Sequence, residues 1–177
     1  RAEGLMGAVT GKALARELAP MLTGFLLSGR AGSAITAEIA TMKVSEQVDA
    51  MEAMAVEPIH YLVVPRLIAM TFMAPILSFL FVFIGELGSY VVALVMFDVD
   101  QAVYFGKITT FVRMEDIWSG GQKALAFGAI VSLVACRYGL TATGGAKGVG
   151  KSTTNSVVMT LLILLICEFI MTYFQMS

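Results

Sequence analysis

The chain has 177 residues, of which 58% are hydrophobic and only 14% are charged. An ordinary soluble domain has about 25% charged residues, so this composition predicts an all-α, polytopic membrane protein. The formal net charge of −1, without any long basic run, excludes nucleic acid as a partner.

Four apolar segments are long enough to form membrane-spanning helices, because about 20 residues of α-helix cross ~30 Å of hydrocarbon. We expect these helices at residues 18–42, 67–97, 121–140 and 155–176. The second is the longest and contains Pro75, Gly85 and Gly88, which predict a tilted or kinked helix. Because the connections between the spans are short and no internal repeat is visible, we expect one transmembrane domain over residues 1–177.

The first span carries a row of small residues four apart, namely Gly24, Ser28, Gly32, Thr36 and Ala40, beside a second row that begins at Gly29. Small side chains let another helix backbone approach closely within a membrane. Two interpretations remain open. The row packs within one bundle, or it forms a subunit interface or the lining of a moving gate.

Two charged residues, Arg30 and Glu38, lie inside this same span. A charge at the membrane centre costs roughly 2.5–3.5 kcal/mol on insertion scales unless it is paired or hydrated. The two lie ~12 Å apart along the helix and roughly 80° apart around it, which makes a direct pair unfavourable. Glu86 and Glu168 are alternative partners for Arg30. The four residues form either structural salt bridges or a path for a headgroup or substrate.

Between the first two spans, residues 43–57 have the pattern of a short amphipathic helix at the membrane surface. One face is apolar (Val44, Val48, Met51 and Ala55), and another is acidic (Glu46, Asp49 and Glu52). Ser45 is the expected N-cap, and Pro58 is expected to end the helix. Met51 and Met54 offer an adaptable surface for a partner protein. A plain surface helix is the alternative.

The distribution of Lys and Arg sets the orientation of the spans. The loops on one side of the membrane carry more cations than the loop at 98–118 on the other side; these cations are Lys43, Arg66, Arg137, Lys147 and Lys151. The difference disappears when the cations of the N-terminal segment are counted with the loop at 98–118. We place residues 43–66 and 137–151 in the cytoplasm. Segment 98–118 is then an aromatic belt at the outer interface or a plain surface loop.

The segment Gly145–Ser152 matches the G-x-x-x-x-G-K-[ST] pattern of a phosphate-binding loop. That loop requires a preceding buried strand, whereas a membrane span precedes it here. We therefore expect a tight glycine turn, with Ser152 or Thr153 as the N-cap of the last span. His60 is the single histidine, and neither a metal site nor a catalytic arrangement is visible.

The stretch from Glu17 to Arg66 resembles the signature of MlaE-type permeases, the membrane subunits of ABC transporters associated with MCE proteins. The resemblance rests on Glu17-Leu-Ala-Pro20, Gly29-Arg30-Ala-Gly-Ser33, Ala37-Glu38-Ile39, Met42, Glu46-Gln47, Asp49 to Met54, Pro58 and Pro65-Arg66. Gly148-Val-Gly150 and Thr153-Thr154 are similar to that family's loop before its last helix. The family usually has Ala where Ser152 stands.

The resemblance implies a homodimeric permease of the bacterial inner membrane, with a periplasmic C-terminus, that moves phospholipids between the inner membrane and the outer envelope. Cytoplasmic ATPase subunits would dock on segment 43–57 as the coupling helix, through Glu46, Gln47, Asp49, Met51, Glu52 and Met54. A periplasmic MCE ring and a small cytoplasmic accessory subunit are further expected partners. ATP and Mg²⁺ would be bound by the ATPase, which leaves this chain without a cofactor or catalytic residues.

Members of this family begin with an interfacial helix and a first membrane helix that we do not find in residues 1–177. The four spans would then be the family's helices two to five. The alternative function is a secondary transporter or channel in which Arg30, Glu38, Glu86 and Glu168 form an ion relay. Segment 43–57 and the absence of repeats favour the ABC permease. A membrane-embedded NTPase rests on Gly145–Ser152 alone.

Overall fold

The computed structural model describes residues 6–176, and these form helices without any strand. The first part is a continuous helical path of α1 (Met6–Ala13), α2 (Ala19–Leu27) and α3 (Ser33–Val44). Two π-helical segments, η2 (Leu14–Leu18) and η3 (Ser28–Gly32), join its parts. The rest comprises α4 (Gln47–Ala53), the π-helical η4 (Ile59–Val63), α5 (Val64–Phe97), α6 (Gln101–Phe111), α7 (Met114–Leu140) and α8 (Gly145–Met176).

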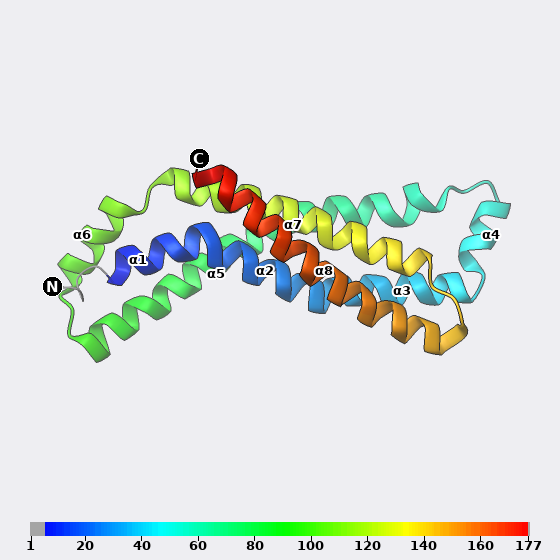
Figure 1. Cartoon of the computed structure of the whole chain (residues 1–177), viewed down its shortest axis with the longest axis horizontal. Helices are drawn as coiled ribbons and strands as arrows, with labels where there is room; N and C mark the ends of the chain where they lie inside the picture. Colours follow the sequence, from blue (N-terminus) through cyan, green and yellow to red (C-terminus); the bar gives the residue numbers. More distant parts are fainter. Residues whose placement is uncertain (1–5, 177) are drawn as a thin grey trace.

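The long helices lie side by side in an elongated bundle (Figure 1). Helix α4 and the connection from α7 to α8 lie at one end of the bundle, and α6 lies at the other end beside the start of α1 (Figure 1). The all-α fold of a polytopic membrane protein is thereby confirmed. Residues 43–66 and 137–151 are predicted on one side of the membrane and residues 98–118 on the other, and the structure places these two groups at opposite ends of the bundle.

Three helices of the described part are long and apolar enough to cross a membrane, judged by length and composition: Ile59–Phe97, Met114–Leu140 and Gly145–Gln175. Our prediction of four such spans is therefore not met as stated, because segment 18–42 is not among them. That segment is helical throughout. Its apolar character is diluted by Gly, Ser and Thr and by Arg30, since much of its surface faces other helices and not lipid.

Helix α7 is the centre of the bundle and packs against α2, α3, α5 and α8. Its contact with α5 is the most extensive, and it depends on Gly128, where an added Cβ would meet the Met70 carbonyl and the Ala74 side chain. The buried apolar core joins Met70, Phe127, Val131 and Leu164 from α5, α7 and α8. Close packing at Gly128 thus brings α5 and α7 together.

The small-residue row of the first helical path lies on one buried face. Gly24, Ser28, Gly32, Thr36 and Ala40 are all buried. In an ideal α-helix, a row with a spacing of four drifts by about 40° per step. The wider π-helical turn of η3 counteracts this drift, because it adds a residue to the turn. All five positions consequently remain in contact with the bundle.

The same row packs within this chain. An added Cβ at Gly24 would meet Leu164 and Phe127, and one at Gly32 would meet Val131. The Thr36 hydroxyl lies 3.1 Å from the Ala135 carbonyl oxygen and 2.9 Å from the Ser156 hydroxyl, which connects α3 to α7 and α8. Gly29 begins the second row and is exposed, with nothing within 4 Å of an added Cβ.

Segment 98–118 is more ordered than a plain surface loop, since α6 occupies most of it. Asp100 caps α6 by accepting a hydrogen bond from the Ala102 N–H at 2.8 Å. Tyr104 is buried against α1, whereas Phe105, Phe111 and Trp118 are exposed, as expected for an aromatic belt. The many exposed side chains of α5 and α8 are mostly apolar, which suits a surface in contact with lipid.

The amphipathic segment is shorter than predicted. Helix α3 continues to Val44, Glu46 turns the chain with a positive φ of 60°, and α4 covers only Gln47–Ala53. Ser45 is not an N-cap: it is the C-cap of α3, and its hydroxyl donates back to the Thr41 carbonyl at 2.8 Å. Pro58 does not end α4 either. It starts η4, consistent with the preference of Pro for the beginning of a helix.

The last connection is also shorter than predicted. It covers residues 141–144, and α8 begins at Gly145. Gly144 and Gly145 both have a positive φ, of 90° and 67° respectively. Ser152 and Thr153 therefore lie inside α8 and do not cap it. An added Cβ at Gly148 would collide with the Thr143 carbonyl, so glycine allows the tight entry into α8.

Candidate functional site

A buried, ion-paired site surrounds Lys123 of α7, whose side chain is 0% exposed. Its Nζ lies 2.7 Å from Oε2 of Glu17, 3.1 Å from Oε1 of Glu168 and 2.8 Å from the Thr172 hydroxyl. We call these four residues the Lys123 cluster. The cluster joins η2, α7 and α8, three elements that are far apart in the sequence.

The Lys123 cluster has more acceptors than its ammonium group can satisfy. Oε2 of Glu168 is buried and has no hydrogen-bond partner, and the Glu168 side chain is 12% exposed. The Glu17 side chain is 37% exposed, so the cluster is open to its surroundings on the Glu17 side. The three N–H groups of Lys123 are all used, so the free acceptor for a further donor is Oε2 of Glu168.

Sequence reasoning missed Lys123 and gave Glu17 no role beyond the family motif. The available signal was the position of Lys123 inside a predicted span, where a charged side chain must find a partner. We predict Glu168 as a member of the buried charges, and the structure places it in this cluster. Its partner is Lys123 and not Arg30, contrary to our expectation.

Each π-helical segment of the first helical path contains charged residues. Segment η2 contains Arg16 and Glu17, and η3 contains Arg30. π-Helical turns occur mostly as single insertions and often at functional sites. Here they turn the charged side chains relative to the apolar face, while the small residues stay packed against the bundle.

Arg30 is exposed and lines an apolar groove between α2 and α5. The groove has a volume of about 390 Å³, and its walls are formed by Thr23, Leu26, Leu27, Arg30, Leu77, Leu80, Phe81 and Ile84. The α5 residues among these lie near the middle of Val64–Phe97, which places Arg30 far from either end of that helix. No carboxylate within residues 6–176 forms an ion pair with Arg30.

The other two predicted charges have partners of their own. Glu38 forms an ion pair with Arg66, in which Oε1 of Glu38 lies 2.9 Å from Nη2 of Arg66. The Glu38 side chain is 61% exposed. Oε1 of Glu86 accepts a hydrogen bond from the Tyr104 hydroxyl at 2.8 Å. Burial raises the pKa of Tyr104 to about 12, so this hydroxyl keeps its proton at neutral pH. Arg30, Glu38, Glu86 and Glu168 therefore do not form one relay.

Arg16, in the first helical path, contacts the N-terminal end of α7. Its guanidinium lies 3.5 Å from the buried Asp116 carboxylate and also donates to the Gln175 carbonyl at 3.4 Å. Asp116 in turn accepts the Arg113 N–H at 3.0 Å and closes a capping box at the start of α7. This contact fixes η2, and with it Glu17, against α7.

At the opposite end, α4 packs mainly on α3 and is anchored by Val48, which is 2% exposed. The predicted coupling residues Glu46, Gln47, Asp49, Glu52 and Met54 are exposed, and Met51 is half-buried. Asp49 pairs with Lys43, and this hydrogen bond raises the pKa of Lys43 above its usual value. Most of the acidic face is thus available to a partner.

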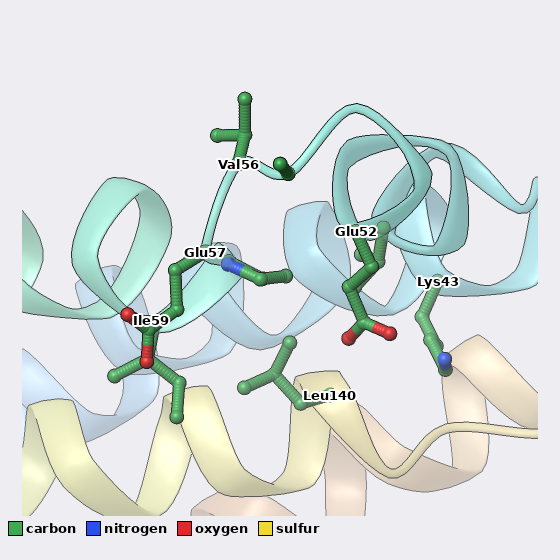
Figure 2. A pocket seen from close by; sticks show the side chains of 9 residues that line it. Lys43, Glu52, Val56, Glu57, Ile59 and Leu140 are labelled. Carbon is green, nitrogen blue, oxygen red and sulfur yellow. The ribbon is translucent and has the colours of Figure 1, made fainter.

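A groove of about 550 Å³ separates α4 from the end of α7. Figure 2 shows Glu52 and Glu57 on either side of Leu140, with Lys43 beside Glu52. The remaining walls are Val48, Ala55, Val56, Pro58 and Ile59. Carboxylates around an apolar floor suit a protein segment that combines basic and apolar side chains.

The segment Gly145–Ser152 forms the first two turns of α8. The helix α7 precedes it, and no strand occurs within residues 6–176. Because the backbone N–H groups of a phosphate-binding loop must converge on one point after a strand, this arrangement is not such a loop.

Comparisons with known proteins show the family to which the chain belongs. The family model described as Permease MlaE matches residues 1–174. A probable ABC transporter permease of Synechocystis is 43% identical over 168 residues, which are 95% of this chain and 64% of that protein. A probable ABC transporter permease of Rickettsia typhi is 40% identical over 171 residues, which are 97% of this chain and 66% of that protein.

A plant relative extends this similarity. The chloroplastic protein TRIGALACTOSYLDIACYLGLYCEROL 1 of Arabidopsis thaliana is 38% identical over 169 residues, which are 96% of this chain and 48% of that protein. The chain thus spans less than two thirds of the length of these relatives. The family model nevertheless matches nearly all of it. The chain belongs to the MlaE permease family.

Proposed function

We propose that this chain is the membrane subunit of an ABC transporter that moves phospholipids between the inner membrane and the outer envelope of a bacterial cell. Family membership supports a transport subunit. The observation that carries the lipid assignment is Arg30, a cation without an ion-pair partner in residues 6–176, in an apolar groove at the middle of the bundle. A phosphate and an acyl chain together match this combination of groups.

The relatives support a lipid as the cargo. The name of the Arabidopsis relative contains trigalactosyldiacylglycerol, which is a glycerolipid. The Lys123 cluster offers a second set of polar groups inside the bundle, open on the Glu17 side. A lipid headgroup that passes through a membrane needs such groups along its way, because each unpaired polar group in hydrocarbon costs several kcal/mol.

Coupling to ATP is assigned to a separate subunit. We propose that α4, together with the groove below it, receives a cytoplasmic ATPase, and that ATP and Mg²⁺ are bound by that subunit. The exposed acidic residues of α4 and the anchoring of α4 by the single buried Val48 support this role, because a short helix held at one point can move with its partner.

Membership of the MlaE permease family supports a further proposal about the assembly and its orientation. We propose a homodimer with a periplasmic MCE ring and a small cytoplasmic accessory subunit as further partners. The chain would cross the bacterial inner membrane several times, with α4 in the cytoplasm and the C-terminus in the periplasm. We also propose that residues 1–177 form one transmembrane domain.

A secondary transporter is the second candidate, and the Lys123 cluster favours it. A buried Lys with two carboxylates is the type of group that ion-coupled carriers use. The two functions differ in their source of energy. An ABC permease requires its ATPase, whereas a secondary transporter responds to an ion gradient without ATP.

The test is reconstitution of the intact permease with its ATPase in proteoliposomes that contain a fluorescent phospholipid. We expect lipid movement on addition of ATP and Mg²⁺, and none with an ion gradient alone. Movement driven by a gradient without ATP would contradict the proposal and favour the secondary transporter. A variant in which the ATPase cannot hydrolyse ATP is the control.

A further inference from the structure

The hairpin formed by α7 and α8 carries only positive charges at its α4 end. Between Asp116 and Glu168 the sequence contains no acidic residue, whereas Arg137, Lys147 and Lys151 lie at or just after the end of α7. None of these three cations forms an ion pair with the described residues 6–176. By contrast, Lys43 and Arg66 at the same end are each paired with a carboxylate.

A groove of about 350 Å³ runs between α7 and α8 at this end. Arg137, Tyr138 and Thr141 supply its polar groups from the last turn of α7 and the residue after it. Val134, Met159 and Ile163 line the rest, from the preceding turn of α7 and from the part of α8 beyond its first turns. The groove thus has a cationic, hydroxyl-bearing mouth and an apolar continuation toward the middle of the bundle.

We propose that this groove binds a membrane lipid with an anionic headgroup as a resident ligand. The Arg137 guanidinium would hold the phosphate, the Tyr138 hydroxyl would donate a further hydrogen bond to it, and one acyl chain would lie along Val134, Met159 and Ile163. The Thr141 hydroxyl donates to the Arg137 carbonyl at 2.8 Å and shapes the mouth of the groove without binding the phosphate. Basic pockets between membrane helices at the cytoplasmic side are suited to anionic headgroups. A guanidinium can bind a phosphate through two parallel hydrogen bonds.

Charge argues against a second copy of this chain as the occupant. In a two-fold symmetric contact, the same surface meets itself. Such a contact through this groove would bring Arg137 of both copies together without any acidic residue of α7 or α8 between 117 and 167 to compensate. An anionic lipid removes this repulsion. The site is separate from the Arg30 groove and does not depend on which lipid is transported.

The test uses the intact permease, purified in detergent and incubated with equal amounts of phosphatidylglycerol and phosphatidylcholine. Native mass spectrometry then measures which lipid remains bound. We expect the wild type to retain phosphatidylglycerol in preference, and Arg137→Gln to reduce this preference about fivefold, the change that corresponds to ~1 kcal/mol per basic side chain. Lys147→Gln removes the same charge outside the groove and should leave the preference nearly unchanged.

A second variant tests the apolar part. Met159→Trp should fill the groove and reduce retention of both lipids, and an unchanged melting temperature will show that it is folded. Equal retention of the two lipids by the wild type, or equal losses in Arg137→Gln and Lys147→Gln, would overturn the proposal. So would displacement of the lipid by millimolar inorganic phosphate, or a disulfide between two copies through a cysteine placed at Ile163.

Discussion

At the scale of single residues, the chain separates two kinds of charge inside the bundle. Lys123 is completely buried and held by two carboxylates, whereas Arg30 faces an apolar groove without a carboxylate partner in residues 6–176. A paired and buried charge contributes mainly to the specificity of packing. A charge without a partner at membrane depth is retained when a ligand or another subunit compensates it.

The Lys123 cluster gives the first prediction. Lys123→Met leaves the carboxylates of Glu17 and Glu168 side by side, and removal of one partner from a buried ion pair typically costs about 3–5 kcal/mol. We expect a clearly lower melting temperature in detergent. The triple variant Glu17→Gln, Lys123→Met and Glu168→Gln removes all three charges and should recover most of the loss. A single variant as stable as the wild type would contradict a stabilising role for the pairing.

Arg30 gives the second prediction. Arg30→Gln should reduce ATP-driven lipid movement roughly tenfold, because a hydrogen bond to a charged group contributes ~1.5 kcal/mol or more. Its melting temperature should remain close to that of the wild type, since no ion pair is lost. Glu38→Gln, in the same helical path, is the control: the exposed pair with Arg66 is worth at most ~1 kcal/mol. Unfolding of Arg30→Gln would show that this cation has a structural role instead.

At the scale of elements, composition and periodicity predict the long helices well, because apolar segments of sufficient length permit few other structures in a membrane. Helix α5 starts three residues before the predicted span at 67. Helices α7 and α8 end at residues 140 and 176, as predicted, but they start at 114 and 145, before the predicted starts at 121 and 155. Local boundaries are less predictable. The turn at Glu46 depends on a left-handed residue that is not a glycine, and no sequence signal indicates it.

Contacts between distant segments are the part that the sequence does not reveal. Lys123 lies far from Glu17 and Glu168 in the sequence, so the sequence does not show that they are in contact. It does show that Lys123, inside an apolar segment, needs a partner. The pairing of Glu38 with Arg66 likewise depends on the antiparallel alignment of α3 with α5. The π-helical turns that keep the small-residue row buried also have no signature in one sequence.

Helix α4 gives the third prediction. Reversal of Glu46, Asp49 and Glu52 to Lys should weaken association with the ATPase or uncouple hydrolysis from lipid movement, because the exposed acidic face is the part of α4 that a partner can reach. The permease should remain folded, since Val48 still anchors the helix. Co-purification of the ATPase measures the effect. Glu115→Lys, an exposed reversal at the other end, is the matched control, and an unchanged yield and transport rate in the triple variant would reject this role.

The contact between α5 and α7 gives the fourth prediction. Gly128→Leu places a side chain against the Met70 carbonyl and should force these helices apart, with a large loss of folded protein in detergent. Gly88→Leu adds the same side chain to α5 where nothing lies within 4 Å, and it should be tolerated. Size-exclusion profiles of the two variants give the comparison. Equal behaviour of the two would mean that the close approach at Gly128 is not required.

At the scale of the whole molecule, the two ends of the bundle have different tasks. The end with α4 presents exposed acidic side chains and Met54, which we propose contact a protein partner, and a cationic groove, which we propose binds a lipid. The other end carries α6 with its exposed aromatic residues. Between them lie the polar groups that a lipid headgroup needs. Movement of α4 by a partner would be transmitted along α3 to the helical path that contains Arg30 and Glu17.

The most direct test of this account is the energy source of lipid movement. Proteoliposomes containing the intact permease and its ATPase receive ATP and Mg²⁺, and the transfer of a fluorescent phospholipid is followed over time. We predict transfer that requires hydrolysis by the ATPase subunit and that is unaffected by Lys151→Ala, because Gly145–Ser152 begins a helix and is not a phosphate-binding loop. Lipid transfer by the permease alone on addition of ATP, abolished by Lys151→Ala, would contradict the account.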